Sequence, residues 1–374
     1  MSRACSRSRS KIRIAHGRWR RQGLEPARRR PARFALPDGP GSDHGSCALE
    51  AKGGEALKDT RYGVSAGGGD ASTVLNRIVE IEESGIGAAW LTTGGAGIDG
   101  LTVLAAAATR TNRIKLGTSI VPTWPRHPIV AVQQAQVVEA LAPGRLRLGI
   151  GPSHKPAIQA MYGFDFRAPL GHLKEYVHVA RTLLHDGAVD FKGEFYEAHA
   201  RIAAPMPRVP VLASALRRAS FEYCGAETDG AISWVCPPAH LRDTALPALK
   251  RGAERAGRPV PPLIAHAPIC VHERVEEVRE AVGEQLAIYP KLPFYARMFA
   301  DAGFPEAIES ARWSERMIDA TVAHGSETAV ARQLEALIKS GATEILVSVV
   351  TAGPDRKASW KRALELVGKL EAIA

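Results

Sequence analysis

The amino-acid sequence predicts an α/β fold, a closed (β/α)8 TIM barrel, and three observations support that prediction. Eight short apolar runs alternate with longer amphipathic stretches between residue 61 and the carboxyl terminus. The runs are almost continuously apolar, which is typical of parallel strands that helices cover. Eight such units favour a closed barrel over an open sheet. A doubly wound dinucleotide-binding fold is the alternative, but no G-x-G-x-x-G follows the first run.

In the first half of the barrel, strands and helices are expected to alternate without interruption. Residues that favour helix starts follow three of these strands, namely Ser72, Asp99 and Pro128. The three helices are expected to end near Gly85, Thr109 and Leu141. The first four strands are predicted at residues 62–66, 88–92, 114–120 and 145–150.

In the second half, two insertions interrupt the alternation, one after the fourth strand and one after the seventh. Residues 151–208 are expected to hold a helix at 170–184 and a hairpin that turns at Lys192-Gly193. Residues 290–320 are predicted to be irregular. The remaining strands are predicted at 209–213, 231–234, 264–271 and 344–350, and the last two helices at 326–340, ending at Gly341, and 357–373.

The net charge of +10 comes from the amino-terminal segment. Residues 1–34 hold 12 Lys and Arg side chains and one acidic side chain, so the rest of the chain is close to neutral. We expect residues 1–60 to be a disordered basic tail or the product of a start codon placed too far upstream, and residues 61–374 to be the barrel. A nucleic-acid-binding arm and a targeting segment are the alternatives for the tail. We expect no nucleic-acid partner for the folded domain.

The five cysteines are odd in number and contain no C-x-x-C pair. This pattern indicates a reducing compartment, without a disulfide framework or a zinc site, and we therefore expect a cytoplasmic protein without a bound metal. No run of 18 apolar residues occurs, so no membrane span is expected.

The chemistry of such a barrel is expected at the carboxyl ends of its strands. Three of these ends are rich in small and hydroxyl residues, at 118–123, 149–154 and 213–218. Small residues let a backbone approach a flat polar ligand, and a helix start with small residues favours phosphate. His154 is the candidate for proton transfer, although a loop histidine with a solvent or backbone partner is the alternative.

These segments, in this order, resemble the luciferase-like monooxygenase superfamily, and specifically its actinobacterial branch that depends on the deazaflavin coenzyme F420. The matching pieces include LGTSIVPTWPRHP, QQAQVVEALAPGRLRLGIGPSH, VDFKGEFYEA and PVLASALRRASFEYCGAETDGAISW. The resemblance covers roughly residues 61–374. It implies a bacterial luciferase-like barrel with a non-prolyl cis peptide bond between Ser119 and Ile120.

The resemblance also implies roles for individual residues. His154 would be catalytic, and small-molecule substrate and cofactor would share the barrel mouth. Homodimers are common in the family and are expected here. The residues implied to bind cofactor, or to position its ring and the substrate, are Thr92, Thr93, Ser119, Ile120, Gly151, Ser153, Ser214, Ala215, Leu216, Gly225 and Trp234.

Two departures from the family pattern leave other functions open. Thr92-Thr93-Gly94-Gly95 stands where relatives carry Pro-Gln after the leucine, and Arg217-Arg218 stands where relatives carry Gly-Pro. The prediction is an F420-dependent oxidoreductase that transfers a hydride between the deazaflavin and a small organic substrate. An FMN-dependent monooxygenase and a non-catalytic cofactor-binding barrel are the alternatives.

Overall fold

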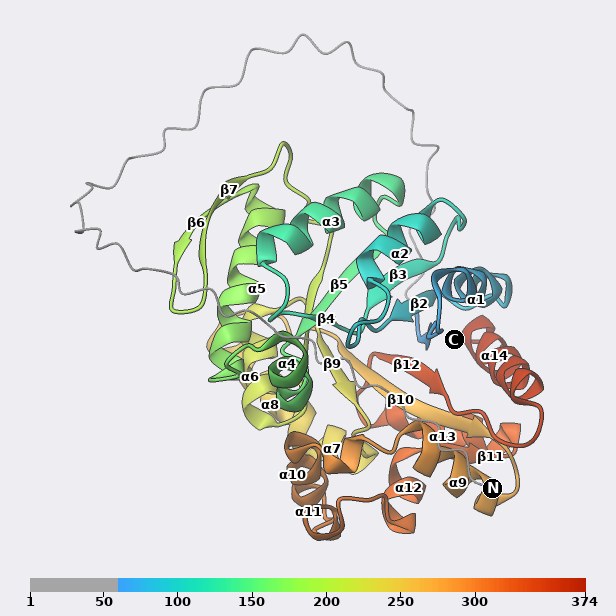
Figure 1. Ribbon diagram of the computed structural model, residues 1–374. Coiled ribbons are helices and arrows are strands. Elements are labelled where there is room, and N and C mark those ends of the chain that lie inside the picture. The colour runs from blue at the N-terminus through green and yellow to red at the C-terminus, as the bar shows by residue number, and fades with distance from the viewer. Residues whose placement is uncertain (1–59) are drawn as a thin grey trace, which may run out of the picture. The chain divides into compact units, whose positions relative to one another are not determined.

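The computed structural model describes residues 60–374, so the tail predicted at residues 1–60 lies almost entirely outside the described part of the chain. Eight parallel strands form a closed ring in which the last strand pairs back with the first, and helices surround them (Figure 1). The predicted barrel is therefore confirmed. In ring order the strands are β1 (Tyr62–Ser65), β2 (Ala88–Leu91), β3 (Lys115–Thr118), β5 (Leu146–Gly151), β8 (Val211–Ser214), β9 (Ala231–Trp234), β10 (Leu263–Val271) and β12 (Glu344–Val349).

Outer helices follow the strands of the ring much as predicted. Asp99 caps the second helix, as predicted, through its carboxylate, which accepts from the Thr102 N–H at 3.0 Å. The predicted cap Ser72 is wrong, because Asp70 accepts from the Thr73 N–H at 2.9 Å, and a carboxylate also complements the helix dipole. The outer helices are α1 (Ala71–Glu83), α2 (Gly100–Ala108), α3 (Pro128–Leu141), α6 (Arg218–Glu227), α8 (Leu246–Arg255), α13 (Glu327–Lys339) and α14 (Arg356–Ala372). A short helix, α7 (Pro238–His240), and a π-helical turn, η1 (Leu241–Ala245), lead into α8.

The insertion after β5 holds two helices and a hairpin that extends beside α5 (Figure 1). Its elements are α4 (Lys155–Tyr162), which the sequence did not predict, α5 (Pro169–Asp186), β6 (Ala188–Lys192) and β7 (Glu197–Arg201). The hairpin turn lies after Lys192 and not at the predicted Lys192-Gly193. The Glu175 carboxylate accepts from the N–H groups of three consecutive turn residues, 194–196, and this fixes the turn at that place.

The insertion after β10 is more regular than predicted. It contains α9 (Val275–Gln285), a 3-10 turn η2 (Tyr289–Lys291), α10 (Pro293–Asp301), α11 (Glu306–Ser310), α12 (Glu315–Thr321) and a short strand β11 (Ala323–Gly325) that pairs with β10. The expectation of irregular structure at 290–320 is therefore wrong. These helices are too short to show the periodicity that identifies a helix in a sequence.

The third strand, predicted at residues 114–120, ends at Thr118, and a two-residue strand, β4 (Val121–Pro122), follows and pairs with β5. The Thr118 hydroxyl stands at the break. It donates to the Gly149 carbonyl at 2.7 Å and accepts from the Gly149 N–H at 2.9 Å. This side chain replaces backbone pairing between the two strands. Ser119 and Ile120, which lie between β3 and β4, form a bulge before β4 pairs with β5.

The interior of the barrel is filled by Trp90, which is fully buried. Its indole N–H donates to Glu344 at 3.1 Å, and the Arg147 guanidinium lies 4.1 Å from its ring. Arg147 and Glu344 are themselves an ion pair, with 2.7 Å between nitrogen and oxygen. Gly117 makes room for the indole, because a Cβ there would lie 2.3 Å from a Trp90 ring carbon.

A buried histidine joins the first insertion to the bulge. His172 of α5 is 3% exposed, and its ring stacks on Trp124 with 3.7 Å between ring centroids. Its Nδ1 lies 3.2 Å from the Thr123 hydroxyl and its Nε2 lies 2.8 Å from the Tyr196 hydroxyl. Burial lowers the pKa of His172 to about 4. A neutral imidazole therefore holds the segment that follows β4.

Replacing Gly117 by alanine should destabilise the fold by about 1–3 kcal/mol, since the added methyl group overlaps the Trp90 indole and the barrel wall cannot move freely. Urea unfolding followed by circular dichroism measures the loss. Gly69→Ala is the matched control, because nothing lies within 4 Å of a Cβ at that position. Equal stabilities of the two variants would contradict the proposed packing.

The His172 pKa predicts an acid-dependent loss of stability. The unfolded chain takes up a proton on this imidazole near pH 6.5, whereas the folded state resists protonation down to about pH 4. Stability should therefore fall as pH drops through this window, with a contribution from His172 on the order of 3 kcal/mol. Unfolding free energies of the wild type and of His172→Gln at pH 7, 6, 5 and 4 measure this difference in slope. Parallel curves would show that His172 does not titrate as described.

Candidate active site

Side chains that point inward from the strands form an apolar floor with a more polar layer above it. The floor is a separate cluster of buried residues, with Ile120 packed on it, that comprises Ala88, Trp90, Leu212, Ile232, Ile264 and Leu346. Alternate strand residues face the same side, so the positions two residues further along face the barrel mouth. Those positions on five of the strands are Thr92, Ser214, Trp234, His266 and Ser348.

The bulge lies on one side of this mouth. The peptide bond between Ser119 and Ile120 is cis, which confirms the prediction. The Thr92 hydroxyl donates to the Ser119 carbonyl at 2.7 Å, and the Thr93 N–H donates to the Ile120 carbonyl at 3.2 Å. The two threonines after β2 therefore hold both carbonyls of the bulge. The hydroxyl of Thr93 accepts from the Gly100 N–H at 3.0 Å, so this side chain is engaged by the start of α2.

Gly151 brings the bulge close to the end of β8. A Cβ at Gly151 would lie 2.2 Å from the Ser214 hydroxyl oxygen and 3.1 Å from a side-chain carbon of Ile120. Three of the predicted residues, Ile120, Gly151 and Ser214, are thus in one place. The glycine lets the side chains of Ile120 and Ser214 approach the backbone of β5 closely.

His154 follows on the same loop, directly before α4. It is half-buried, and it makes no capping hydrogen bond to the helix. Burial lowers its pKa, with no charged side chain of the described barrel contributing to the shift. Ser153 immediately before it has φ +59°, in the left-handed region that non-glycine residues rarely occupy. The backbone therefore turns sharply to present the imidazole.

Trp234 ends β9 on the opposite side. Its indole N–H is buried without a hydrogen-bond partner among the described residues, and its ring lies 4.1 Å from the His266 ring centroid. Val235 after it has φ +49°, which is unusual for a β-branched residue. Left-handed non-glycine residues thus adjoin both His154 and Trp234, and such backbone strain is concentrated at functional sites.

The predicted phosphate segment is already hydrogen-bonded within the chain. The N–H of Ala215 donates to the Ile232 carbonyl at 2.9 Å, and the N–H groups of Leu216 and Arg217 donate to the Ser220 hydroxyl at 3.2 and 3.3 Å. Arg217 pairs with Asp301 of α10 at 2.8 Å, and Arg218 pairs with Glu222 at 3.2 Å. A phosphate at this helix start would have to replace the contacts of Ser220.

Gly225 lies apart from the mouth, on the face of α6 that packs against α8. A Cβ there would lie 2.0 Å from the Leu249 carbonyl oxygen. Glycine occupies this position because the two helices approach each other too closely for a larger side chain. The structure therefore does not bring Gly225 together with the other predicted cofactor residues.

Four residues of the mouth were not predicted from the sequence. His266 and Ser348 are joined by a hydrogen bond of 2.7 Å between Nε2 and Oγ, and Tyr289 and Tyr295 come from the second insertion. The sequence does indicate the first two. His266 and Ser348 lie two residues after Ile264 and Leu346, and alternate residues of a strand face the same side. No comparable signal marks the two tyrosines.

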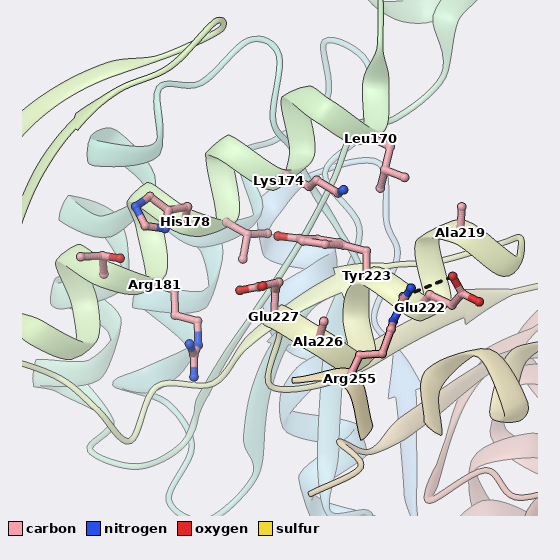
Figure 2. Close-up of a pocket in the computed structure, with 12 residues that line it drawn as sticks. Leu170, Lys174, His178, Arg181, Ala219, Glu222, Tyr223, Ala226, Glu227 and Arg255 are labelled. Atoms are coloured by element: carbon pink, nitrogen blue, oxygen red, sulfur yellow. Dashed lines mark hydrogen bonds and ion pairs between the residues drawn. The ribbon is translucent and has the colours of Figure 1, made fainter. Parts of the chain in front are cut away.

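A separate groove lies on the outside of the barrel between α5, α6 and α8 (Figure 2), with a volume of about 490 Å³. Its side chains carry both charges and are partly paired, as in the 3.4 Å contact between Arg255 and Glu222. Lys174 lies over the Tyr223 ring at 5.6 Å. A second cavity of about 430 Å³ is lined by the ends of β10 and β11 and by Arg362. Neither is lined by the candidate residues.

The described residues contain no group of three or more His, Cys, Asp or Glu side chains that could hold a metal ion. Cys224, Cys236 and Cys270 are buried and free, while Cys5 and Cys47 lie outside the described residues. Within residues 60–374 no helix is long and apolar enough to cross a membrane. The polar groups of the mouth are hydroxyls, imidazoles and an indole N–H. Such groups suit the binding of an organic ring and the movement of a proton.

Sequence comparison finds relatives of this chain, and the names of some of them specify F420-dependent enzymes. A relative of 28% identity over 244 residues, covering 60% of this chain and 71% of the relative, is an uncharacterized protein of Mycobacterium tuberculosis. An F420-dependent glucose-6-phosphate dehydrogenase of Segniliparus rotundus is 31% identical over 45% of this chain and 52% of the relative, so the match spans about half of that enzyme. A 5,10-methylenetetrahydromethanopterin reductase of Methanopyrus kandleri is 22% identical over 84% of this chain and 98% of the relative.

Solved structures share the fold. The coenzyme F420-dependent tetrahydromethanopterin reductase of Methanopyrus kandleri superposes with a TM-score of 0.66 at 23% identity, over 83% of this chain and 98% of that one. An F420-dependent secondary alcohol dehydrogenase gives 0.68 at 16% identity over the same shares. The family model described as luciferase-like monooxygenase matches residues 54–344. This match covers most of the barrel, and the chain belongs to the luciferase-like monooxygenase family.

Proposed function

We propose that this protein is an F420-dependent oxidoreductase that transfers a hydride between the deazaflavin coenzyme and a small organic substrate. The observation that carries the proposal is that the Ser119–Ile120 bulge, Gly151 and Ser214 meet at the carboxyl ends of neighbouring strands, next to an apolar floor. Relatives of 31% identity and structures of the same fold bear names that specify coenzyme F420. These names support the cofactor assignment.

The residues of the mouth fit such a coenzyme. A flat tricyclic ring needs an apolar surface beneath it and hydrogen-bonding groups at its edge. Ile120 and the floor residues supply the surface, while Thr92, Ser119 and Ser153 supply hydroxyls at the edge. The buried Trp234 indole N–H, which has no partner among the described residues, is a further donor for the ring or its substrate. When bound, the coenzyme supplies hydride chemistry at its C5 position, and the protein supplies binding, orientation and electrostatics.

His154 moves the proton in this proposal. Its lowered pKa keeps the imidazole neutral at pH 7, so it is ready to accept a proton from a substrate hydroxyl. In the reverse direction the protonated form returns the proton to a carbonyl oxygen. The half-buried position limits access of water to the imidazole.

The experiment that tests the cofactor is a fluorescence titration of the purified protein with F420 and with FMN. We expect F420 to bind at micromolar concentration or below and FMN to bind at least tenfold more weakly. Tighter binding of reduced FMN together with oxygen consumption would establish the alternative, a flavin-dependent monooxygenase. Binding of F420 without turnover over a broad panel of alcohols and carbonyl compounds would establish a non-catalytic barrel.

We also propose a homodimer and a cytoplasmic location. Three apolar side chains on one face of α3 are exposed, namely Val130, Val137 and Leu141, at 42%, 52% and 46%. Positions 130, 137 and 141 lie on one stripe of the helix, as expected for a face that another surface covers. The three free cysteines of the described residues are consistent with a reducing compartment.

His154→Ala should lower kcat by roughly 100-fold or more, because general acid–base catalysis typically contributes this much. Affinity for the coenzyme should change less than about threefold, since the imidazole makes no capping or structural hydrogen bond. Steady-state rates and coenzyme titrations of this variant and of His154→Gln measure the two effects. Full turnover in either variant would remove the proton-transfer role.

The pH profile of alcohol oxidation follows from the same residue. The rate needs neutral His154, and burial lowers the pKa of this imidazole below its ordinary value near 6.5. We therefore expect kcat/KM to decrease as pH falls, with the half-maximal value reached below pH 6.5. An inflection above pH 7 that disappears in His154→Gln would contradict the lowered pKa.

Ser153→Gly removes the hydroxymethyl group and keeps the backbone conformation, because glycine adopts φ +59° without strain. The free energy of unfolding should stay the same or increase by up to about 1 kcal/mol. Affinity for F420 should fall by roughly fivefold if the hydroxyl binds the ring, in line with one lost hydrogen bond of about 1 kcal/mol. Unchanged affinity would place Ser153 among residues that only shape the backbone.

Val137→Glu should convert the proposed dimer into a monomer, because a charged side chain would be buried at the centre of the interface. Light scattering coupled to size-exclusion chromatography reads the mass directly. Ile288→Glu is the matched control, since Ile288 is also exposed (58%) but belongs to the second insertion. A wild-type monomer at micromolar concentration would end this part of the proposal.

A further inference from the structure

An uninterrupted row of five aromatic rings borders the mouth from the loop after β5 to the middle of β10. The row runs from His154 to Tyr295, Tyr289, Trp234 and His266, with successive ring centroids 5.6, 5.1, 5.3 and 4.1 Å apart. We call these five residues the aromatic wall. Each contact is tilted or edge-to-face, the arrangement that aromatic rings prefer. The wall is therefore a rigid, shaped surface and not a set of loose side chains.

Three of the five members of the aromatic wall are partly accessible, although Tyr295 also belongs to the hydrophobic core. His154, Trp234 and Tyr289 are half-buried, whereas His266 and Tyr295 are 7% and 8% exposed. Two of the five side chains come from the insertion between β10 and β12, which has no role in closing the barrel. A side chain that is supplied by an insertion and left partly accessible at the mouth is placed to contact a ligand.

Polar groups along the wall are uncharged. The His266 ring is hydrogen-bonded to the Ser348 hydroxyl at 2.7 Å, and the Trp234 indole N–H is buried without a partner among the described residues. Burial lowers the pKa of His266 to about 3 and lowers that of His154, so both imidazoles are neutral. Burial also raises the pKa of Tyr289 and Tyr295, which keeps both phenols protonated.

The wall itself contains no cationic side chain, because its members are two histidines that burial holds neutral, two tyrosines and a tryptophan. Arg217, which borders the mouth on α6, is paired with Asp301 at 2.8 Å. A phosphate or carboxylate group against these rings would lose its hydration without gaining a charge partner from the wall, which is unfavourable.

We propose that the substrate is an uncharged alcohol or carbonyl compound with an apolar, preferably aromatic or cyclic, body that packs on the aromatic wall, and that phosphorylated substrates are excluded. This inference rests on the proposed oxidoreductase function. The apolar body would contact the rings of Trp234 and Tyr289, while the oxygen of the substrate faces His154. A single oxygen can be satisfied by the imidazole of His154, so no charged side chain is needed.

The experiment is a direct binding measurement with the full-length protein, with and without saturating F420. Acetophenone and 1-phenylethanol are the neutral probes, and glucose 6-phosphate and benzoate are the charged probes. Isothermal titration should show at least 30-fold tighter binding of the neutral probes. Quenching of tryptophan fluorescence by acetophenone should be largely lost in Trp234→Phe, because Trp234 is the tryptophan of the wall. Equal or tighter binding of either charged probe would overturn the inference.

A pair of variants at one position tests the electrostatic part. Tyr289→Phe keeps the wall neutral and should change affinity for acetophenone by less than threefold. Tyr289→Lys places a cation at a half-buried position, and it should weaken acetophenone binding by roughly tenfold and strengthen benzoate binding by a similar factor. Circular dichroism confirms that both variants fold. Benzoate binding that does not respond to the new charge would show that the wall does not contact the ligand.

The outcomes separate this inference from the proposed function. F420 binding together with a preference for charged probes would refute the neutral substrate and leave the oxidoreductase proposal in place. Binding of neutral probes without any F420 binding would refute the cofactor and keep the aromatic wall as a ligand site. Failure of both neutral probes to bind, with F420 present and bound, would refute the wall as the substrate site.

Discussion

The interaction on which the rest of the structure depends is the burial of Trp90 inside the barrel. An eight-stranded ring leaves an interior that side chains must fill. Here one indole does much of this, held by a hydrogen bond to Glu344 and by the Arg147 guanidinium on its face. Arg147 and Glu344 form a nearly buried ion pair, and loss of either partner would leave a buried charge at a cost of about 3–5 kcal/mol. The indole sets the height of the apolar floor, and the floor sets where a flat ligand can lie.

Two insertions build the walls above that floor. The first holds the bulge, because His172 of α5 contacts both Thr123 and Tyr196 and stacks on Trp124. The second supplies Tyr289 and Tyr295 to the opposite side. The barrel itself contributes only small groups, such as Gly151 and the Thr92 hydroxyl. A common fold thus acquires a particular mouth from segments that the ring of strands does not require.

The sequence was sufficient to predict the ring of strands. The apolar runs of β1, β2, β9 and β12 are buried on both sides, and the helices between strands begin at recognisable caps. It also located the cis bond at Ser119–Ile120, although this came from the resemblance and not from the residues alone. It failed where tertiary contacts decide the local structure. The turn after Lys192 depends on the distant Glu175 carboxylate, and the short helices after residue 290 depend on packing that no periodicity reveals.

The candidate site shows the same division between local and distant information. Ile120, Gly151 and Ser214 lie at strand ends and come together because parallel strands end at one edge of the barrel. Tyr289 and Tyr295 reach the mouth only through the fold of a whole insertion, so no local pattern marks them. Gly225 matched a family position, yet the carbonyl of Leu249 accounts for it through the packing of two helices.

The distribution of charged side chains determines which chemistry the mouth can support. The ion pair of Arg147 and Glu344 lies at the amino-terminal end of the strands, below the floor, and the arginines of α6 are paired with carboxylates outside it. The inward groups above the floor are hydroxyls, imidazoles and rings. Burial holds the two imidazoles neutral, because the described barrel offers them no carboxylate that would favour the charged form. A neutral histidine can accept a proton from an alcohol, whereas an imidazolium cannot, so the burial that keeps His154 neutral is itself a condition of the chemistry proposed for it.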